Sequence, residues 1–128
     1  MVTTSEAVTE GIRIEVKARF APEHSEPMRW FFLYTIRISN EGSEVVQLIS
    51  RHWLIRDASG RTEEVRGPGV IGEQPVIDPG ESYEYTSGCP LPTPFGSMEG
   101  SYHFVTEGGA EFDARIAEFM LREPGAIH

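Results

Sequence analysis

The chain has few of the residues on which several classes of protein depend. It holds one cysteine, Cys89, so no disulfide can form within it, and a reducing, cytoplasmic location is expected. Lysine and arginine number 11 against 20 acidic residues, which gives a formal net charge of −9. Because nucleic acid is held mainly by clustered basic residues, it is not expected as a partner. Long apolar runs are absent as well, so membrane insertion by a helix is not expected.

The remaining composition is that of one globular domain. The 128 residues are 39% hydrophobic and 10% aromatic, which is enough to bury one core. The first residues are small and polar and have no apolar face. We therefore expect a flexible leader over residues 1–8, one β-sandwich domain over residues 9–122 and a C-terminal tail over residues 123–128.

Alternation of apolar and polar residues predicts β-strands along most of the chain. Between Ile12 and Phe20 every second residue is apolar and the others are charged. A break in this pattern between Leu48 and Trp53 predicts a β-bulge. Seven strands joined by turns, without a helix, predict an all-β, antiparallel two-sheet sandwich. The strands are expected at residues 12–20, 28–39, 44–57, 61–65, 82–86, 98–106 and 110–121.

Glycine and proline are concentrated between Gly67 and Tyr102. This segment holds more than half of the 13 glycines and of the nine prolines, so it forms turns and cannot be helical. It opens with Gly67, Gly69 and Gly72 in the spacing GxGxxG. That spacing holds a pyrophosphate where a helix follows, but Pro75 comes too soon after the motif for a helix to begin. A turn or a tight strand crossing is the favoured interpretation, and an anion-binding nest of backbone amides is the alternative.

No combination of residues predicts a catalytic, metal or cofactor site. His52 and His103 fall in predicted strands and could meet across the fold, but their spacing identifies no metal site. Cys89 has no basic neighbour in the sequence that would activate it, and Gly88 and Pro90 predict a turn around it. We therefore expect an inert thiol and a protein that is not an enzyme.

The proline-rich run PLPTPF indicates a surface for recognition. Its Leu91 and Phe95 would be presented on a loop that prolines hold rigid, and rigid apolar groups lose little entropy when they bind a protein. An equally good interpretation is that both side chains cap one open end of the sandwich. The edge strands of a sandwich also offer a route to a homodimer.

A long series of motifs in the sequence resembles the ApaG family. The resemblance extends over nearly the whole chain, from Thr9 to Leu121, with Ala117 standing where the family pattern leads us to expect proline. The matching motifs are Arg51-His52-Trp53, the run from Gly67 to Pro75, Pro79-Gly80-Glu81, Tyr85-x-Ser87-Gly88 and the run from Leu91 to Tyr102.

The resemblance implies an immunoglobulin-like or fibronectin type III-like sandwich, which agrees with the predicted strands. Bacterial members of the family are associated with cobalt resistance and magnesium efflux, and commonly accompany a diadenosine tetraphosphatase. Similar domains in eukaryotes occur in an F-box protein and in a protein that interacts with a DNA polymerase, which implies a protein-binding role. The resemblance also implies a pyrophosphate-binding hypothesis for Gly67, Gly69 and Gly72.

Two functional hypotheses follow. The first is a non-enzymatic, cytoplasmic protein-interaction module without a cofactor, which influences divalent-cation handling through a protein partner still to be identified. The alternative is a sensor that holds a nucleotide polyphosphate, or a divalent metal with it, on the loop from Gly67 to Gly72.

Overall fold

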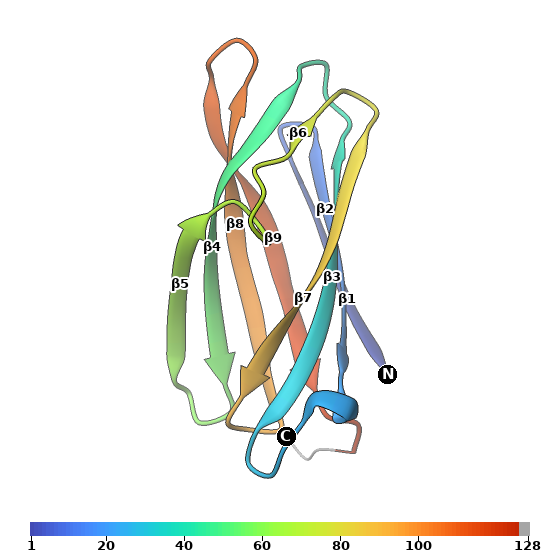
Figure 1. Ribbon diagram of the computed structural model, residues 1–128, viewed down its shortest axis with the longest axis vertical. Helices are drawn as coiled ribbons and strands as arrows, with labels where there is room; N and C mark the ends of the chain where they lie inside the picture. The colour runs from blue at the N-terminus through green and yellow to red at the C-terminus, as the bar shows by residue number, and fades with distance from the viewer. Residues whose placement is uncertain (126–128) are drawn as a thin grey trace.

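The computed structural model describes residues 1–125 as two β-sheets packed face to face (Figure 1). Apart from the short 3-10 helix η1 (Pro22–His24), these residues form strands and the turns between them. No helix among them is long and apolar enough to cross a membrane. The strands are β1 (Val2–Thr9), β2 (Ile12–Phe20), β3 (Trp30–Asn40), β4 (Val46–Asp57), β5 (Thr62–Pro68), β6 (Val76–Ile77), β7 (Ser82–Leu91), β8 (Phe95–Thr106) and β9 (Glu111–Arg122).

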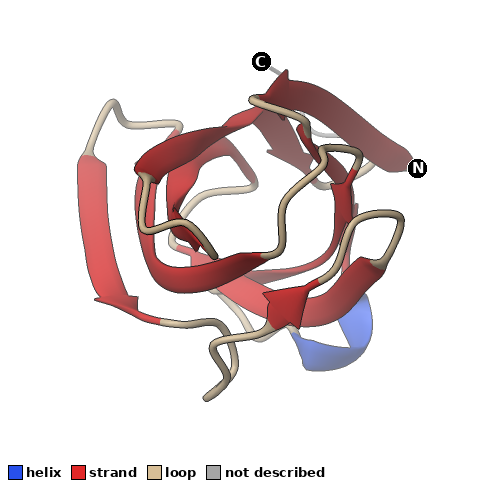
Figure 2. Ribbon diagram, turned by 90° about the horizontal axis from the view of Figure 1, so that it is seen from above, coloured by secondary structure: helices blue, strands red, loops and turns tan. Residues whose placement is uncertain are grey.

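The strands form one sheet in the order β1-β2-β3-β7 and a second in the order β5-β4-β8-β9. The short strand β6 also pairs with β4, beyond the end of β5. Every pairing is antiparallel. Seen from above, the strands surround a central core (Figure 2). This confirms the predicted all-β two-sheet sandwich, and the described strands exceed the expected seven because β1 and β6 were not foreseen.

The core follows the alternation in the sequence. Ile12 and Ile14 of β2 are each 1% exposed, and the residues between the buried positions point away from the core. From the second sheet, the indole of Trp53 meets the ring of Tyr102 edge-on, with ring centroids 6.3 Å apart. A register shift in β4 after Leu48 confirms the predicted bulge. Local patterns therefore identified most of the sandwich correctly.

Residues 1–8 do not form the expected flexible leader. Val2–Thr9 is strand β1, which pairs with β2 along its whole length. Its hydroxyl groups also reach the edge strand β9. Ser5 donates to the carbonyl of Ala117 at 2.8 Å, and Thr9 accepts a hydrogen bond of 3.1 Å from the amide of Arg115. The prediction failed because polar contacts hold this strand in place, so its sequence has no apolar alternation.

Strand β7 runs past the end expected at residue 86, so the predicted turn around Cys89 is wrong. Gly88 lies under the ring of Phe31 on β3, where a Cβ would come within 2.3 Å of the ring carbon Cζ. Pro90 lacks an amide proton, and it lies in an edge strand, where no second neighbour needs one. Glycine and proline here serve close packing and an edge position.

At the C-terminus, part of the expected tail, residues 126–128, lies outside the described residues.

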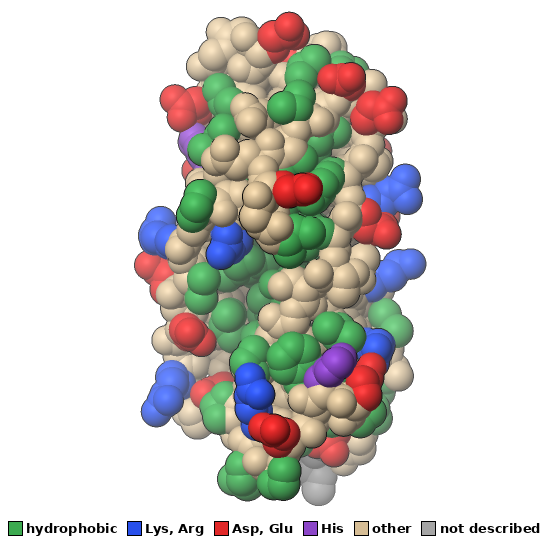
Figure 3. Space-filling model, in the orientation of Figure 1, with side chains coloured by type: hydrophobic (Ala, Val, Ile, Leu, Met, Phe, Trp, Pro, Cys, Tyr) green, Lys and Arg blue, Asp and Glu red, His purple; other side chains and the backbone are tan. Residues whose placement is uncertain are grey.

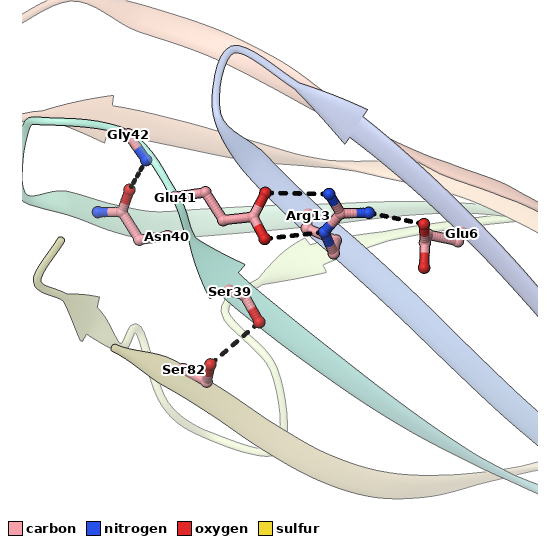
Figure 4. A network of polar contacts seen from close by, with 7 residues as sticks. All are labelled: Glu6, Arg13, Ser39, Asn40, Glu41, Gly42 and Ser82. Atoms are coloured by element: carbon pink, nitrogen blue, oxygen red, sulfur yellow. Dashed lines mark hydrogen bonds and ion pairs between the residues drawn. The ribbon is translucent and has the colours of Figure 1, made fainter. Parts of the chain in front are cut away.

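One end of the sandwich is fastened by Asn40, which is 1% exposed at the end of β3. Its amide nitrogen donates to the carbonyls of Glu44 and Ile77, at 2.8 and 3.0 Å. Its oxygen accepts a hydrogen bond of 3.0 Å from the amide of Gly42, as Figure 4 shows. The bond to Ile77 fixes β6, and so fixes the point at which the chain returns to the core after the GxGxxG motif.

Candidate functional site

The GxGxxG motif leads from the end of β5 into a turn that precedes β6 (Figure 1). At its tip, Val70 and Glu73 exchange two backbone hydrogen bonds of 2.8 and 2.9 Å. Between them, Ile71 has φ 42° and Gly72 has φ 80°, the pattern of a type I′ turn. Val70 is 1% exposed, whereas Ile71 is 59% exposed. We name residues 67–74 the glycine turn, which anchors one side chain in the core and presents the next to solvent.

Arg51 fixes the glycine turn from inside the sandwich. The bulge in β4 places Arg51 on the inner side of its sheet, where its guanidinium donates to two carbonyls of the turn, both at 2.9 Å. A Cβ at Gly67 would lie 2.9 Å from Nη2 of Arg51. A Cβ at Gly69 would lie 2.2 Å from the carbonyl oxygen of Glu73. Gly67 and Gly69 therefore make room for the internal contacts that hold the turn.

The glycine turn has few amides left for an anion. The amide of Gly69 donates to the carbonyl of Ile49 at 2.8 Å, and the amides of Val70 and Glu73 donate to each other's carbonyls. The carboxylate of Glu73 accepts a hydrogen bond of 2.8 Å from the hydroxyl of Tyr83, and it adds negative charge beside the turn. The hypothesis that the three glycines hold a polyphosphate stays a prediction, and this arrangement does not favour it.

Beside the glycine turn, the outer face of the second sheet has a concavity of about 560 Å³. The small side chains of Ser50 and Ser101 leave this face hollow. Two arginines and two histidines line the concavity with one acidic residue, Asp113, and the carboxylates of Glu64 and Glu111 contact the two histidines. The lining residues are Ile49, Ser50, Arg51, His52, Arg66, Gly67, Pro68, Gln74, Ser101, His103 and Asp113.

His52 and His103 both line this concavity, so the structure does bring the two predicted strand histidines to one place. Both imidazoles lie near carboxylates, but Nε2 of His52 has no hydrogen-bond partner among the described residues. His103 contacts Glu111 at 2.7 Å and Asp113 at 2.9 Å, and His52 contacts Glu64 at 3.3 Å. The hydrogen bonds to Glu111 and Asp113 raise the pKa of His103, which favours its charged form. Among residues 1–125, no three or more His, Cys, Asp or Glu side chains are arranged to hold a metal ion.

Cys89 lies in the core and is 4% exposed. Burial raises the pKa of its thiol to about 12, because the charged thiolate is poorly solvated there. A thiol with this pKa stays protonated at neutral pH and is a poor nucleophile. The inert thiol expected from the sequence agrees with this environment, although its position in a strand does not agree with the expected turn.

The structure separates the two residues proposed as a contact surface. Leu91 is 3% exposed and belongs to the core, which corrects the prediction that it contacts a partner. Phe95 is half-buried at the start of β8.

Near the start of β3, Met28 is 76% exposed, has φ 63° and follows Pro27 in a turn. Figure 3 shows hydrophobic side chains at the surface at this lower end of the molecule. Sequence reasoning missed Met28, and Pro27 was the available turn signal.

Fold and site together define a β-sandwich module with a rigid protruding turn and a polar concavity beside it. The chain belongs to the ApaG family, whose model, described as the ApaG domain, matches residues 21–106. Protein ApaG of Anaeromyxobacter sp. (strain K) is 55% identical over 124 residues, covering 97% of this chain and 99% of that protein. Protein ApaG of Bordetella pertussis is 52% identical over 119 residues, covering 91% of each.

Solved structures support the same relationship. The crystal structure of a Bordetella pertussis protein described as ApaA matches with a TM-score of 0.86 at 52% identity, covering 90% of this chain and 95% of that one. The C-terminal domain of Wzt matches with a TM-score of 0.56 at 12% identity, covering 97% of this chain and 80% of that one. The likeness to Wzt concerns the fold alone.

Proposed function

We propose that the protein is a non-enzymatic interaction module that binds another protein through the glycine turn. The observation that carries this proposal is Ile71, an apolar side chain that is 59% exposed on a backbone with φ 42°. A β-branched residue rarely adopts positive φ, and strain of this kind costs about 1–3 kcal/mol. Because the side chain is exposed, burial within the fold does little to offset that cost. Burial of the Ile71 side chain against a partner would offset the cost of this backbone strain.

The glycine turn is also held rigid before any partner binds. Arg51 bonds to its carbonyls from inside the sandwich, and the side chain of Gln74 donates to the carbonyl of Ile49 at 2.9 Å. Val70 anchors the tip in the core. A preorganised turn loses little conformational entropy on association, which favours recognition. Val76, 61% exposed shortly after the turn, extends the apolar surface available to a partner.

Two features favour binding over catalysis. Cys89 keeps its proton at neutral pH because burial raises its pKa to about 12. The imidazole of His103 is held between the carboxylates of Glu111 and Asp113. We extend the proposal to a cytoplasmic setting and to a partner that acts in divalent-cation handling. Both extensions rest on the resemblance to the ApaG family described from the sequence.

Affinity capture from native lysate tests this proposal. The baits are the unchanged protein, the Ile71→Asn variant and a control, Met120→Gln, which alters another exposed apolar side chain, on β9. We expect one partner to be recovered with the unchanged and control baits, and about tenfold less of it with Ile71→Asn, as for a contact at the centre of an interface. Circular dichroism checks that all three baits are folded. Equal recovery with Ile71→Asn would reject the glycine turn as the contact.

A further inference from the structure

A row of hydrogen-bond donors crosses the outer face of the second sheet, next to the glycine turn. In the strand register, Arg66 lies opposite His52, His52 opposite Ser101, and Ser101 opposite Arg115. Directly opposed residues of antiparallel strands point to the same face. Both neighbours of Arg115 on β9 are buried, so Arg115 itself faces outward. We name these four residues the arginine row, which runs across β5, β4, β8 and β9.

The geometry lets the two arginines converge on one ligand. Neighbouring strands lie about 4.8 Å apart, so the backbones of Arg66 and Arg115 are about 14 Å apart, a gap that two extended arginine side chains can close. The hydroxyl of Ser101 and the imidazole of His52 lie between them. Three of the four residues line the concavity of about 560 Å³, and Arg115 lies opposite one of them, Ser101, on the neighbouring strand.

The acidic groups nearby leave both guanidiniums available. Nε of Arg66 contacts the carboxylate of Glu64 at 3.2 Å. The terminal nitrogens of Arg66 make no ion pair with any other residue from 1 to 125. Within the same range, Arg115 makes no ion pair at all. On the β9 side of the concavity, the carboxylates of Glu111 and Asp113 contact His103. The arginine row therefore offers a ligand the terminal nitrogens of Arg66 and the whole guanidinium of Arg115, on a protein that is acidic overall.

We propose that the arginine row binds a phosphoryl group, as inorganic phosphate or as part of a small phosphorylated molecule. A tetrahedral phosphate presents oxygens to both guanidiniums and to the Ser101 hydroxyl at once, whereas a planar carboxylate offers two oxygens along one edge. The concavity has the volume of a small-molecule site and exceeds a single phosphate, so diphosphate is expected to bind more tightly. The arginine row binds through outward side chains of the second sheet and not through the exposed tip of the glycine turn at Ile71, so the proposal can fail while the proposed function holds, and the reverse.

NMR titration of the full chain tests the proposal, with inorganic phosphate, diphosphate and acetate added in parallel at constant ionic strength. We expect saturable shifts at the Nε protons of Arg66 and Arg115 and at the amide of Ser101. The double variant Arg66→Gln/Arg115→Gln is expected to bind diphosphate about 10–100-fold more weakly, because each charge-assisted hydrogen bond contributes strongly.

A matched control separates this site from general electrostatic attraction. The double variant Lys17→Gln/Arg37→Gln removes the same charge from exposed positions on β2 and β3 of the other sheet, and its affinity for diphosphate should stay within about twofold of the unchanged protein. Four results would each overturn the proposal: shifts that never saturate, equal weakening by both double variants, acetate binding as tightly as phosphate, and shifts confined to the amides of Ile71 and Gly72.

Discussion

Two turns of this protein have nearly the same φ angles but carry different side chains. Glu10 (φ 46°) and Gly11 (φ 81°) join β1 to β2, and Ile71 (φ 42°) and Gly72 (φ 80°) form the tip of the glycine turn. In each pair, a residue with a side chain precedes a glycine, and both have positive φ. Glu10 is polar and exposed, as a turn in solvent favours, whereas Ile71 is apolar and exposed. The apolar side chain at the tip is the feature that folding alone does not explain.

The glycines of the two turns also have different surroundings. A Cβ at Gly11 would lie 2.9 Å from the Cα of Gly42, in the connection between β3 and β4. A Cβ at Gly72 would meet no atom within 4 Å. Gly11 is therefore needed both for positive φ and for the close approach of two backbones, whereas Gly72 is needed for positive φ alone. The first turn belongs to the packing of the sandwich, and the second stands clear of it.

The largest effect is expected from Gly11→Ala. We expect it to lower the free energy of unfolding by about 2–3 kcal/mol, because strain at positive φ adds to displacement of the backbone around Gly42. Urea unfolding followed by circular dichroism measures the change. A loss no larger than that of Gly72→Ala would contradict the difference between the two turns.

A smaller effect is expected from Gly72→Ala. The free energy of unfolding should fall by about 1 kcal/mol, because only the positive φ is disfavoured. Gly60→Ala serves as the control, since Gly60 has φ 89° and an added Cβ there also meets nothing within 4 Å. The two variants should lose similar stability in the same urea assay. A much larger loss at Gly72 would mean that the tip makes contacts essential to the fold.

The smallest effect, of opposite sign, is expected from Ile71→Asn. Asparagine tolerates positive φ better than a β-branched residue, so the free energy of unfolding should rise by about 0.5 kcal/mol. Glu10→Asn should raise it by less, because glutamate is not β-branched. Thermal unfolding of the two variants in parallel measures the difference. If Ile71→Asn were destabilised, the isoleucine would serve the fold, and the reason to assign it to a partner would be lost.

The elements that could be predicted are those whose pattern is local. The alternation from Ile12 to Phe20 and the break after Leu48 both correspond to what the structure contains. Strand β1 was missed because its serine and threonine hydroxyls bind the backbone of β9, a contact that leaves no periodic apolar signal. The second half of β7 is not predictable from the sequence because glycine favours turns, whereas Gly88 makes room for Phe31 across the sheet.

The candidate site likewise has features that the sequence predicts and features that it does not. Gly67, Gly69 and Gly72 could be predicted to form a turn, but the sequence left open whether they serve a ligand or the chain. The arrangement of Arg51 and its carbonyl partners favours the second use. The exposure of Ile71 and the burial of Leu91 could not be predicted, because each depends on what packs beside it.

Neighbours along the chain specify the strands with apolar alternation, the bulge in β4 and the turn at the glycines, so these features can be predicted from sequence. The folded sheet is needed to bring the four residues of the arginine row into line, because their alignment requires three strand pairings in register at once. The bulge is visible locally, yet its consequence, the turning of Arg51 inward, appears only when the sheets are assembled. Backbone preferences act over a few residues, whereas a surface is built by pairing strands that lie far apart in the sequence.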